Sequence, residues 1–314
     1  MRAAGAPVFY DYSFLDAYER APLQNTYAYF YVTFGRPLMA ALPVYLQDAD
    51  DPAGDIAALG LAGLAPGDRI LRTHVAHCYD TGLPARAPLS GLAGPACEVL
   101  ADLARQAGAK WFAFLDVDGG GELAGELAAA GLTKIPMTTR FRRDLSAFAA
   151  AREFVSSIPS RNARSALLNA RNQGRRAGLR VAGLTPSETG PDAVELCRAT
   201  TARHGTPEYY PEQLHEFVAR AGDITRIVEV RLGDRLAAAS VCLVDDTRYH
   251  CWAGGFDYAA TNQVRSLFPL IMWPWVDDAI ALGRPILEVG RANSATKQRF
   301  RFDSVPLFAF VGRP

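Results

Sequence analysis

Several features that would assign a function at once are missing from this sequence. No segment approaches roughly 18 uninterrupted apolar residues, so we expect no membrane span. The first residues, MRAAGAPVFYDYSF, hold no apolar run of the kind that marks a signal peptide. The five cysteines include no C-x-x-C pair, which favours reduced thiols in a cytoplasmic protein over a disulfide framework. The motifs G-x-S-x-G, H-E-x-x-H and the P-loop are absent as well, so no common hydrolase or nucleotide site is predicted.

Composition sets broad limits on what remains. The 314 residues are 49% apolar and carry 33 basic and 33 acidic side chains, which is typical of a globular protein with ample core. Because the chain is not basic as a whole, a nucleic acid would need a local cationic patch. The close pair His74 and His77, with Cys78, lacks a second ligand cluster. We therefore interpret these imidazoles as part of a loop after a strand and expect no metal.

The order of predicted elements occurs twice along the chain. YAYFYVTFGRPLMAALPVYLQ and TRIVEVRLGDRLAAASVCLVD both read as two strands around a glycine turn, the pattern of a β-hairpin. Each is followed by a third strand, a helix that ends at a glycine, and a further strand, WFAFLDV or PILEVG. Such duplication predicts two domains, 1–150 and 151–314, with α/β architecture of the α+β type built on mixed sheets.

A cationic segment opens the second half. Residues 154–187 contain six arginines and no Asp or Glu. Ser160 is a helix start, and small apolar residues then recur at helical spacing. A helix of this kind suits an anionic partner such as a phosphate-bearing donor, so Arg164, Arg171 and Arg175 are candidate donor-binding residues. The alternative is a solvated helix whose arginines pair with acids elsewhere.

The strongest chemical candidates lie in the last third of the chain. Glu288 ends a predicted strand and is followed by Arg291 and Lys297; a carboxylate among cations is a candidate base or amine anchor, or else a structural ion pair. The strand RYHCWAGGFD alternates Tyr249, Cys251 and Ala253 on one face with His250, Trp252 and Gly254 on the other. The catalytic candidates are therefore Glu288, Lys297, Tyr249 and His250, although Tyr249 and His250 fit pocket walls better.

The loop after this strand is a candidate anion site. It leads through Asn262 and Arg265 to a helix start near Ser266, where backbone N–H groups and an arginine favour a phosphate or carboxylate. We count these three residues and Arg291 as donor-binding candidates. No tightly bound cofactor is predicted.

Four segments together resemble a known family. They are SRNARSALLNARNQGRRAGLRV, RHGTPEYYPEQLHEFV, NQVRSLFPLIMWPWVDDAIALGRPILEVGR and ATKQRFRFDSVPL. In this order they resemble the FemAB-like (FemXAB) family of tandem GNAT-fold acyltransferases. The resemblance covers residues 154–311, and the first half shares only the duplicated order. It implies two tandem GNAT-like domains.

The resemblance implies amide formation from an activated donor, either an aminoacyl-tRNA or an acyl-CoA, to an amine on a small molecule, glycan or peptide. The stretch NQVRSL lacks the glycine pair of the usual CoA pyrophosphate loop, which places a standard acetyl-CoA site in doubt. No coiled-coil arm is evident, which argues against cell-wall crossbridge synthesis. Two alternatives remain open: an acyl-CoA-dependent N-acyltransferase of a small-molecule biosynthetic pathway, and a non-catalytic module that binds an anionic glycan or nucleic acid.

Overall fold

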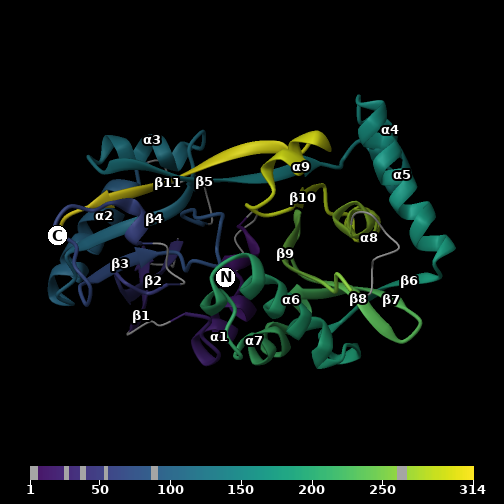
Figure 1. Ribbon diagram of the computed structural model, residues 1–314. Helices are drawn as coiled ribbons and strands as arrows, with labels where there is room; N and C mark the ends of the chain where they lie inside the picture. The colour runs from purple at the N-terminus through teal and green to yellow at the C-terminus, as the bar shows by residue number, and fades with distance from the viewer. Residues whose placement is uncertain (1–5, 25–27, 36–39, 53–55, 86–90, 260–266) are drawn as a thin grey trace. The chain divides into compact units, whose positions relative to one another are not determined.

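The computed structural model describes residues 6–24, 28–35, 40–52, 56–85, 91–259 and 267–314 (Figure 1). The chain groups into two compact units, which we call unit 1 (Met1–Arg140 with Val305–Pro314) and unit 2 (Phe141–Ser304). By compactness the chain therefore passes into unit 2 at Phe141, and its last residues belong to unit 1. The domain limits 1–150 and 151–314 stay a prediction beside this grouping.

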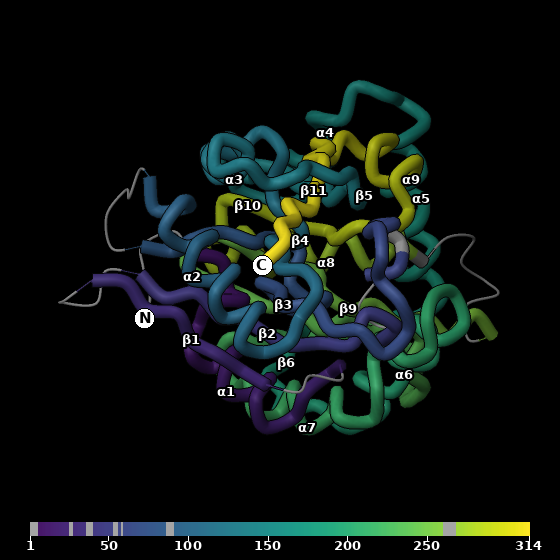
Figure 2. Tube along the Cα trace, turned by 90° about the vertical axis from the view of Figure 1, so that its left-hand side faces the viewer, coloured from purple at the N-terminus to yellow at the C-terminus, as the bar shows by residue number. Residues whose placement is uncertain are grey.

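Unit 1 is built on a mixed sheet in the order β1-β2-β3-β4-β11-β5. β3 and β4 are parallel, whereas β1–β2, β2–β3 and β4–β11 are antiparallel. Figure 2 shows the C-terminal strand returning beside β4. The strands are β1 (Ala28–Phe34), β2 (Ala40–Asp48), β3 (Arg69–Thr73), β4 (Trp111–Asp118), β5 (Thr133–Asp144) and β11 (Asp303–Gly312). The helices are α1 (Tyr12–Arg20), α2 (Ala93–Gln106) and α3 (Glu122–Ala129).

Strand β2 shows why helices cover both faces of this sheet. Leu42, Val44 and Leu46 alternate along the strand and join the core that α2 and α3 close. Tyr45 points to the opposite face, where its ring centroid lies 5.9 Å from that of Tyr18 in α1. A strand buried on both faces has a nearly continuous apolar sequence, as ALPVYL does here.

The histidines of unit 1 are buried in its core. His74 is fully buried: its Nδ1 accepts from the Val75 N–H at 2.7 Å, and its Nε2 lies 2.9 Å from the Phe9 carbonyl oxygen. Burial lowers the pKa of His74 to about 3, so the ring is neutral and both nitrogens are used. Among the residues that the structure describes, no group of three or more His, Cys, Asp or Glu side chains is placed to hold a metal ion.

The strands of unit 2 follow the order β5-β10-β9-β8-β7-β6 and are also of mixed direction. Only β9 and β10 are parallel among its registered pairs in the described residues. α6 and α7 cover one face of β7 to β9, and α8 covers the other (Figure 1). The strands are β6 (Leu179–Leu184), β7 (Thr225–Leu232), β8 (Arg235–Val244), β9 (Arg248–Phe256) and β10 (Ile286–Glu288). The helices are α4 (Ala151–Ser157), α5 (Arg161–Arg176), α6 (Pro191–His204), α7 (Leu214–Ala221), α8 (Leu267–Ala281) and α9 (Ser294–Arg299).

The arginine-rich segment forms α5 as predicted. The Ser160 side chain caps the helix by accepting from the Ala163 N–H at 3.2 Å. Its buried stripe packs against α8, where the Trp273 indole N–H donates to the Leu167 carbonyl at 3.1 Å. Gly174 belongs to this stripe because a Cβ there would lie 2.8 Å from the Leu270 side chain. Small residues on one face therefore let two helices approach closely.

The duplicated order predicted from the sequence is present. Unit 1 runs β1-β2-β3-α2-β4, and unit 2 runs β7-β8-β9-α8-β10. Each run ends in a parallel pair made by a helical crossover, β3–β4 or β9–β10. The mixed α/β fold class is thereby confirmed.

Two further findings concern membrane spans and cysteines in the described residues. No helix there is long and apolar enough to cross a membrane. All five cysteines, each of which lies in a described segment, are buried free thiols.

Candidate active site

Strands β9 and β10 separate at one end of unit 2. Their parallel register runs from Ile286 opposite Arg248 to Glu288 opposite His250. The next residue, Val289, donates its N–H to the Phe141 carbonyl of β5 at 2.9 Å instead. Since β9 continues to Phe256, its edge beyond His250 has no neighbouring strand on this side in the described part of the chain.

A β-bulge marks the same point on β9. Val241 of β8 pairs with Ala253 and Cys242 pairs with Cys251, which leaves Trp252 as an extra residue. The predicted strict alternation of RYHCWAGGFD is therefore wrong beyond Trp252, because the bulge shifts the side-chain phase by one. Cys251 still packs in the core beneath α8, but a Cβ at Gly255 would lie 2.5 Å from the backbone of α6.

A cavity of about 560 Å³ lies where the strands separate. This volume is within the range of roughly 300–1,000 Å³ that is usual for small-molecule sites. Its walls come from β9, from the segment after β10, and from α6, α8 and α9. The lining residues are Thr200, Thr201, His204, Gly205, Cys251, Trp252, Ala253, Gly254, Phe256, Tyr258, Phe268, Trp275, Val289, Gly290, Arg291, Ala292, Asn293 and Lys297.

A short turn after α6 bonds to both sides of the opening. Tyr210 is buried, and its hydroxyl donates to the carbonyl oxygen of the bulge residue Trp252 at 3.1 Å. Its neighbour Tyr209 ends the 3₁₀ turn Pro207–Tyr209, and its hydroxyl accepts from the Arg291 guanidinium at 2.7 Å. The two tyrosines thus connect β9 to the segment that follows β10.

Lys297 is a buried cation in the wall of the cavity. It lies on α9 with 3% of its surface exposed. Burial lowers the pKa of Lys297 to about 7; the nearby Cys251 thiol acts to raise the pKa and Arg291 to lower it. An amine with this pKa can gain or lose a proton near neutral pH, which suits a group in a reaction centre.

One family model matches the part of the sequence that holds the cavity. Residues 161–298 match the model of the acetyltransferase (GNAT) domain. Every residue that lines the cavity falls within the match. This region is similar in sequence to a GNAT domain. The match supports an acyltransferase in general and leaves its donor and acceptor to be proposed.

Solved structures with this fold span nearly the whole chain. The C-terminal domain of a putative lysylphosphatidylglycerol synthetase from Agrobacterium fabrum is 14% identical, with TM-score 0.64, and the match covers 100% of this chain and 91% of that one. FemX is 10% identical, with TM-score 0.66 and coverage of 100% and 94%. A tandem GNAT protein from the clavulanic acid biosynthesis pathway is 12% identical, with TM-score 0.53 and coverage of 96% and 87%. At these identities the likeness shows the fold, and the expected tandem GNAT architecture is confirmed. No curated protein has a sequence that matches this chain significantly.

Glu288 and His250 occupy the last paired position of β10 and β9, and the residues that follow them, Val289 and Cys251, line the cavity. Glu288 and His250 are both fully buried, and neither is in the cavity lining. Burial and the Cys242 thiol raise the pKa of the Cys251 thiol, and Glu288 adds to this rise. His250 Nε2 lies 3.4 Å from Asp245; burial acts to raise the pKa of that carboxyl, but His250 and backbone hydrogen bonds lower it to about 2.

Tyr249 is placed away from the cavity lining, on the α8 face of β9. Its hydroxyl donates to Asp278 at 2.9 Å, and Asp278 also forms an ion pair with Arg226 at 2.8 Å. Burial, the Cys242 thiol and Asp278 raise the pKa of Tyr249 well above its ordinary value. These contacts give Tyr249 a clear part in attaching α8 to the sheet.

The predicted donor-binding residues are dispersed. Arg291 lines the cavity, whereas the arginines of α5 do not. Arg164 donates to the carbonyls of Ile158 and Pro159, and the Arg171 guanidinium lies 4.3 Å from the centroid of the Trp273 ring. Arg175 is exposed. The candidates of the preceding loop, Asn262, Arg265 and Ser266, lie outside the described residues.

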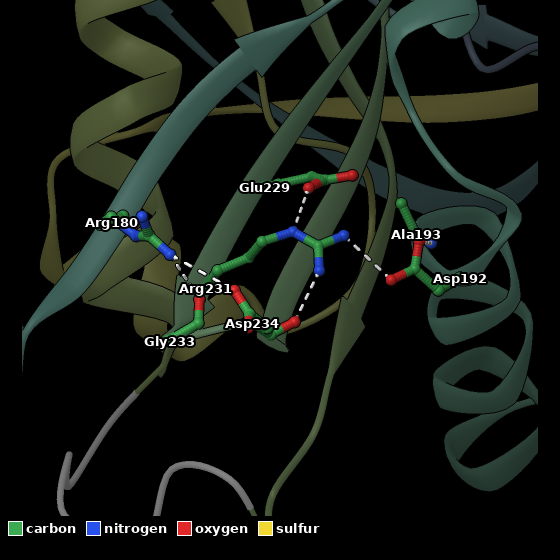
Figure 3. Close-up of polar contacts among 7 residues, drawn as sticks. All are labelled: Arg180, Asp192, Ala193, Glu229, Arg231, Gly233 and Asp234. Carbon is green, nitrogen blue, oxygen red and sulfur yellow. Dashed lines mark hydrogen bonds and ion pairs between the residues drawn. The ribbon is translucent and has the colours of Figure 1, made fainter.

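The last arginine of the acid-free segment belongs to the β7–β8 hairpin (Figure 3). Arg180 donates to the Gly233 carbonyl at 2.9 Å and lies 3.7 Å from the Asp234 carboxylate. Beside it, Arg231 bonds to Glu229 at 2.6 Å and to Asp192 at 2.9 Å. Arg161, Arg175 and Arg176 have no hydrogen-bond or ion-pair partner among the described residues and are exposed. Their charge is therefore available to solvent or to an anionic partner.

The sequence did not identify several residues of the site. Tyr209, Tyr210 and His204 were not assigned to it, and Cys251 and Trp252 were assigned only to strand faces. The segment RHGTPEYY was noted for its resemblance to the family, and its adjacent tyrosines after a proline turn were the available signal. Their hydrogen-bond partners are some 40 and 80 positions away in the sequence, at Trp252 and Arg291, so no local pattern links them.

Proposed function

We propose that this protein is a FemAB-like acyltransferase that forms an amide by moving an acyl or aminoacyl group from an activated donor to an amine. The observation that carries the proposal is the cavity at which β9 loses its strand neighbour, with the buried cation Lys297 in its wall. Backbone groups of an unpaired strand edge can bind the donor as an added strand would. The amine acceptor is then a small molecule, a glycan or a peptide.

The reaction needs three contributions from the protein. The acceptor nitrogen forms a bond to the acyl carbon while the bond to the donor oxygen or sulfur breaks. Lys297 and Arg291 stabilise the negative charge that develops on the acyl oxygen. Glu288, which precedes the lining residue Val289 and is itself outside the lining, acts through one water, which orients the amine and passes to Glu288 the proton that nitrogen loses. No tightly bound cofactor is required by this scheme.

The preferred donor is an aminoacyl-tRNA, as in the FemAB branch. FemX is a structural neighbour, and the exposed arginines of α5 would contact donor phosphates that extend beyond the cavity. NQVRSL lacks the glycine pair that usually holds the pyrophosphate of CoA.

A second candidate donor is an acyl-CoA. The family model that matches residues 161–298 is described as an acetyltransferase, which favours a thioester. In that case the protein acts on a small amine in a biosynthetic pathway.

A transfer assay tests the proposal directly. The full-length protein is incubated with a mixed amine panel and either radiolabelled aminoacyl-tRNA or labelled acyl-CoA, and labelled amide is counted. We expect label transfer from one donor class, with Glu288→Gln and Lys297→Met each lowering the rate by about 10²-fold or more. Binding of tRNA should also weaken steeply between 50 and 200 mM salt, as it does for phosphate contacts in general.

Two results would contradict parts of the proposal. A flat salt response together with turnover of acyl-CoA excludes the tRNA donor. If Glu288→Gln leaves cellular function intact while alanine at Arg161, Arg175 and Arg176 abolishes it, the protein is a non-catalytic anion-binding module.

A further inference from the structure

The cavity has walls of two kinds. One kind is aromatic: Phe256 of β9 and Phe268 and Trp275 of α8 all line it. Phe268 and Trp275 meet edge to face, with ring centroids 5.6 Å apart. Rings packed in this way form a rigid apolar surface whose contact with a ligand costs little side-chain entropy.

The space lies directly in front of these rings. Gly254 also lines the cavity, and a Cβ placed there would meet a single atom within 4 Å, at 3.8 Å on the ring of Phe256. Glycine at this position is thus not required by close packing of the backbone. Its missing side chain instead contributes open volume beside Phe256.

The other kind of wall is cationic. Lys297 is buried and has no ion pair with a carboxylate among the described residues. The Arg291 guanidinium also lines the cavity and is oriented by its 2.7 Å hydrogen bond to the Tyr209 hydroxyl. A buried cation that faces a cavity favours a ligand oxygen that carries negative charge.

An acetyl group is too small for this cavity. It occupies little more than the volume of about two water molecules, at roughly 30 Å³ each. The cavity holds about 560 Å³, so an acetyl group directed to Lys297 would leave most of the aromatic wall to water or to other parts of the donor and acceptor. A larger apolar group would displace that water and gain the hydrophobic free energy of the contact.

We infer that the acyl group transferred by this protein is bulky and apolar, of the size of a phenylacetyl or phenylalanyl group, with its carbonyl oxygen directed to Lys297. The inference rests on the proposed acyl transfer and adds the class of the acyl group. Phe256, Phe268 and Trp275 hold the apolar body, and Gly254 leaves the room for it.

Binding of unreactive probes tests the inference without turnover. Phenylacetate and acetate are titrated into the full-length protein and followed by ligand-observed NMR and by quenching of tryptophan fluorescence. We expect phenylacetate to bind at least about 30-fold more tightly than acetate, because several buried carbons add to the same carboxylate contact. Equal affinity for the two probes, or binding of neither, would overturn the inference.

Two variants locate the probes. Gly254→Val fills the volume beside Phe256. It should lower the affinity for phenylacetate at least about tenfold and change the affinity for acetate by less than about twofold. Lys297→Met should lower the affinity for both phenylacetate and acetate. An unchanged phenylacetate affinity in Gly254→Val, with its melting temperature also unchanged, would show that the ring binds elsewhere and would end the proposal.

Turnover separates this inference from the proposed function. Acetyl and phenylacetyl groups are offered on the same donor, and amide formation is measured with wild type and Gly254→Val. Preference for phenylacetyl that reverses in Gly254→Val supports the inference. Efficient transfer of acetyl with no preference for phenylacetyl is consistent with the proposed function and contradicts the inference. Phenylacetate binding with no transfer from any donor contradicts the proposed function and leaves the cavity as a binding site for a bulky apolar carboxylate.

Discussion

At the scale of single residues, Lys297 carries the clearest physical consequence. Burial holds the pKa of its amine near 7 instead of 10.5. Below pH 7 the amine is charged in the folded and the unfolded chain, so the folded state bears the full penalty of a buried charge. Between pH 7 and 10.5 only the unfolded chain binds the proton, and the stability contribution of this group rises with pH.

We expect Lys297→Met to stabilise the protein at low pH. The free energy of unfolding at pH 6 should rise by about 2 kcal/mol, since an apolar side chain of similar length replaces a buried charge. The gain should shrink at pH 8 and pH 9 as wild-type Lys297 loses its proton. Urea unfolding at the three pH values measures this difference.

Direct titration provides the control. The sequence contains three lysines, so the NMR spectrum of ¹³C-lysine protein is simple to assign, with the Lys297 signal identified by its loss in Lys297→Met. Its midpoint should lie near pH 7. A midpoint above pH 9 would contradict both the placement of this residue and the stability prediction.

Replacing Tyr249 distinguishes a catalytic role of this residue from a structural one. Its hydroxyl bonds to the Asp278 carboxylate, so Tyr249→Phe should lower the free energy of unfolding by about 1–3 kcal/mol. The rate of acyl transfer should change by less than about threefold, far below the 10²-fold or more expected of a general acid or base. Unfolding curves and initial rates at 20 °C measure the two effects. A rate loss of 10²-fold in a folded variant would return Tyr249 to the catalytic set, and Asp278→Asn is the matched control for stability.

At the scale of elements, the bulge in β9 determines the shape of the site. It moves the residues after Trp252 into a new phase, so that Gly254 faces the cavity side and Gly255 faces α6. The two glycines are adjacent in sequence and differ in what surrounds them. They therefore form a natural matched pair.

We expect the pair to respond differently to alanine. Gly255→Ala places a Cβ 2.5 Å from the backbone of Leu196, which cannot move independently of α6. It should destabilise the protein by about 2–3 kcal/mol and disturb the cavity. Gly254→Ala should change stability by less than about 1 kcal/mol. Thermal unfolding of both variants checks this; equal effects would mean that α6 does not pack on β9 as described.

Element prediction from the sequence was successful where the pattern is local. The hairpins, α5 with its Ser160 cap, and the glycine-terminated helices α2 and α8 follow periodicity and turn residues. Strand β5 was missed because TKIPMTTRFRRD is mostly polar or only partly buried, and its few apolar residues form no continuous pattern. Helix α9 was missed because a helix of six residues has less than two turns of pattern.

At the scale of the whole molecule, charge is balanced overall and uneven locally. The chain has 33 basic and 33 acidic residues, yet three exposed arginines of α5 have no partner among the described residues. A long polyanion must therefore bind at a local patch. Arg180 provides a control, since it belongs to the same acid-free segment but is bonded to Gly233 and Asp234.

We expect a triple variant with alanine at Arg161, Arg175 and Arg176 to bind tRNA at least about tenfold more weakly at 100 mM salt. The slope of log K against log salt should fall by about two, because fewer phosphates are neutralised. Arg180→Ala should bind like wild type. Filter binding over a salt series measures both; identical behaviour of the triple variant and Arg180→Ala would exclude α5 as a phosphate-binding surface.

By itself the sequence determined the order of the elements, their duplication, the arginine helix and the neighbourhood of Glu288, Arg291 and Lys297. These follow from hydrogen bonding and side-chain periodicity between residues close in the chain. Only the tertiary structure decided where β9 and β10 separate and that Trp252 forms a bulge. It also decided that Tyr209 and Tyr210 connect the two sides of the opening. Finally, it decided that Lys297 is buried and that Tyr249 bonds to Asp278. Each of these depends on groups far apart in the sequence, whose contact and desolvation exist only once the chain has packed.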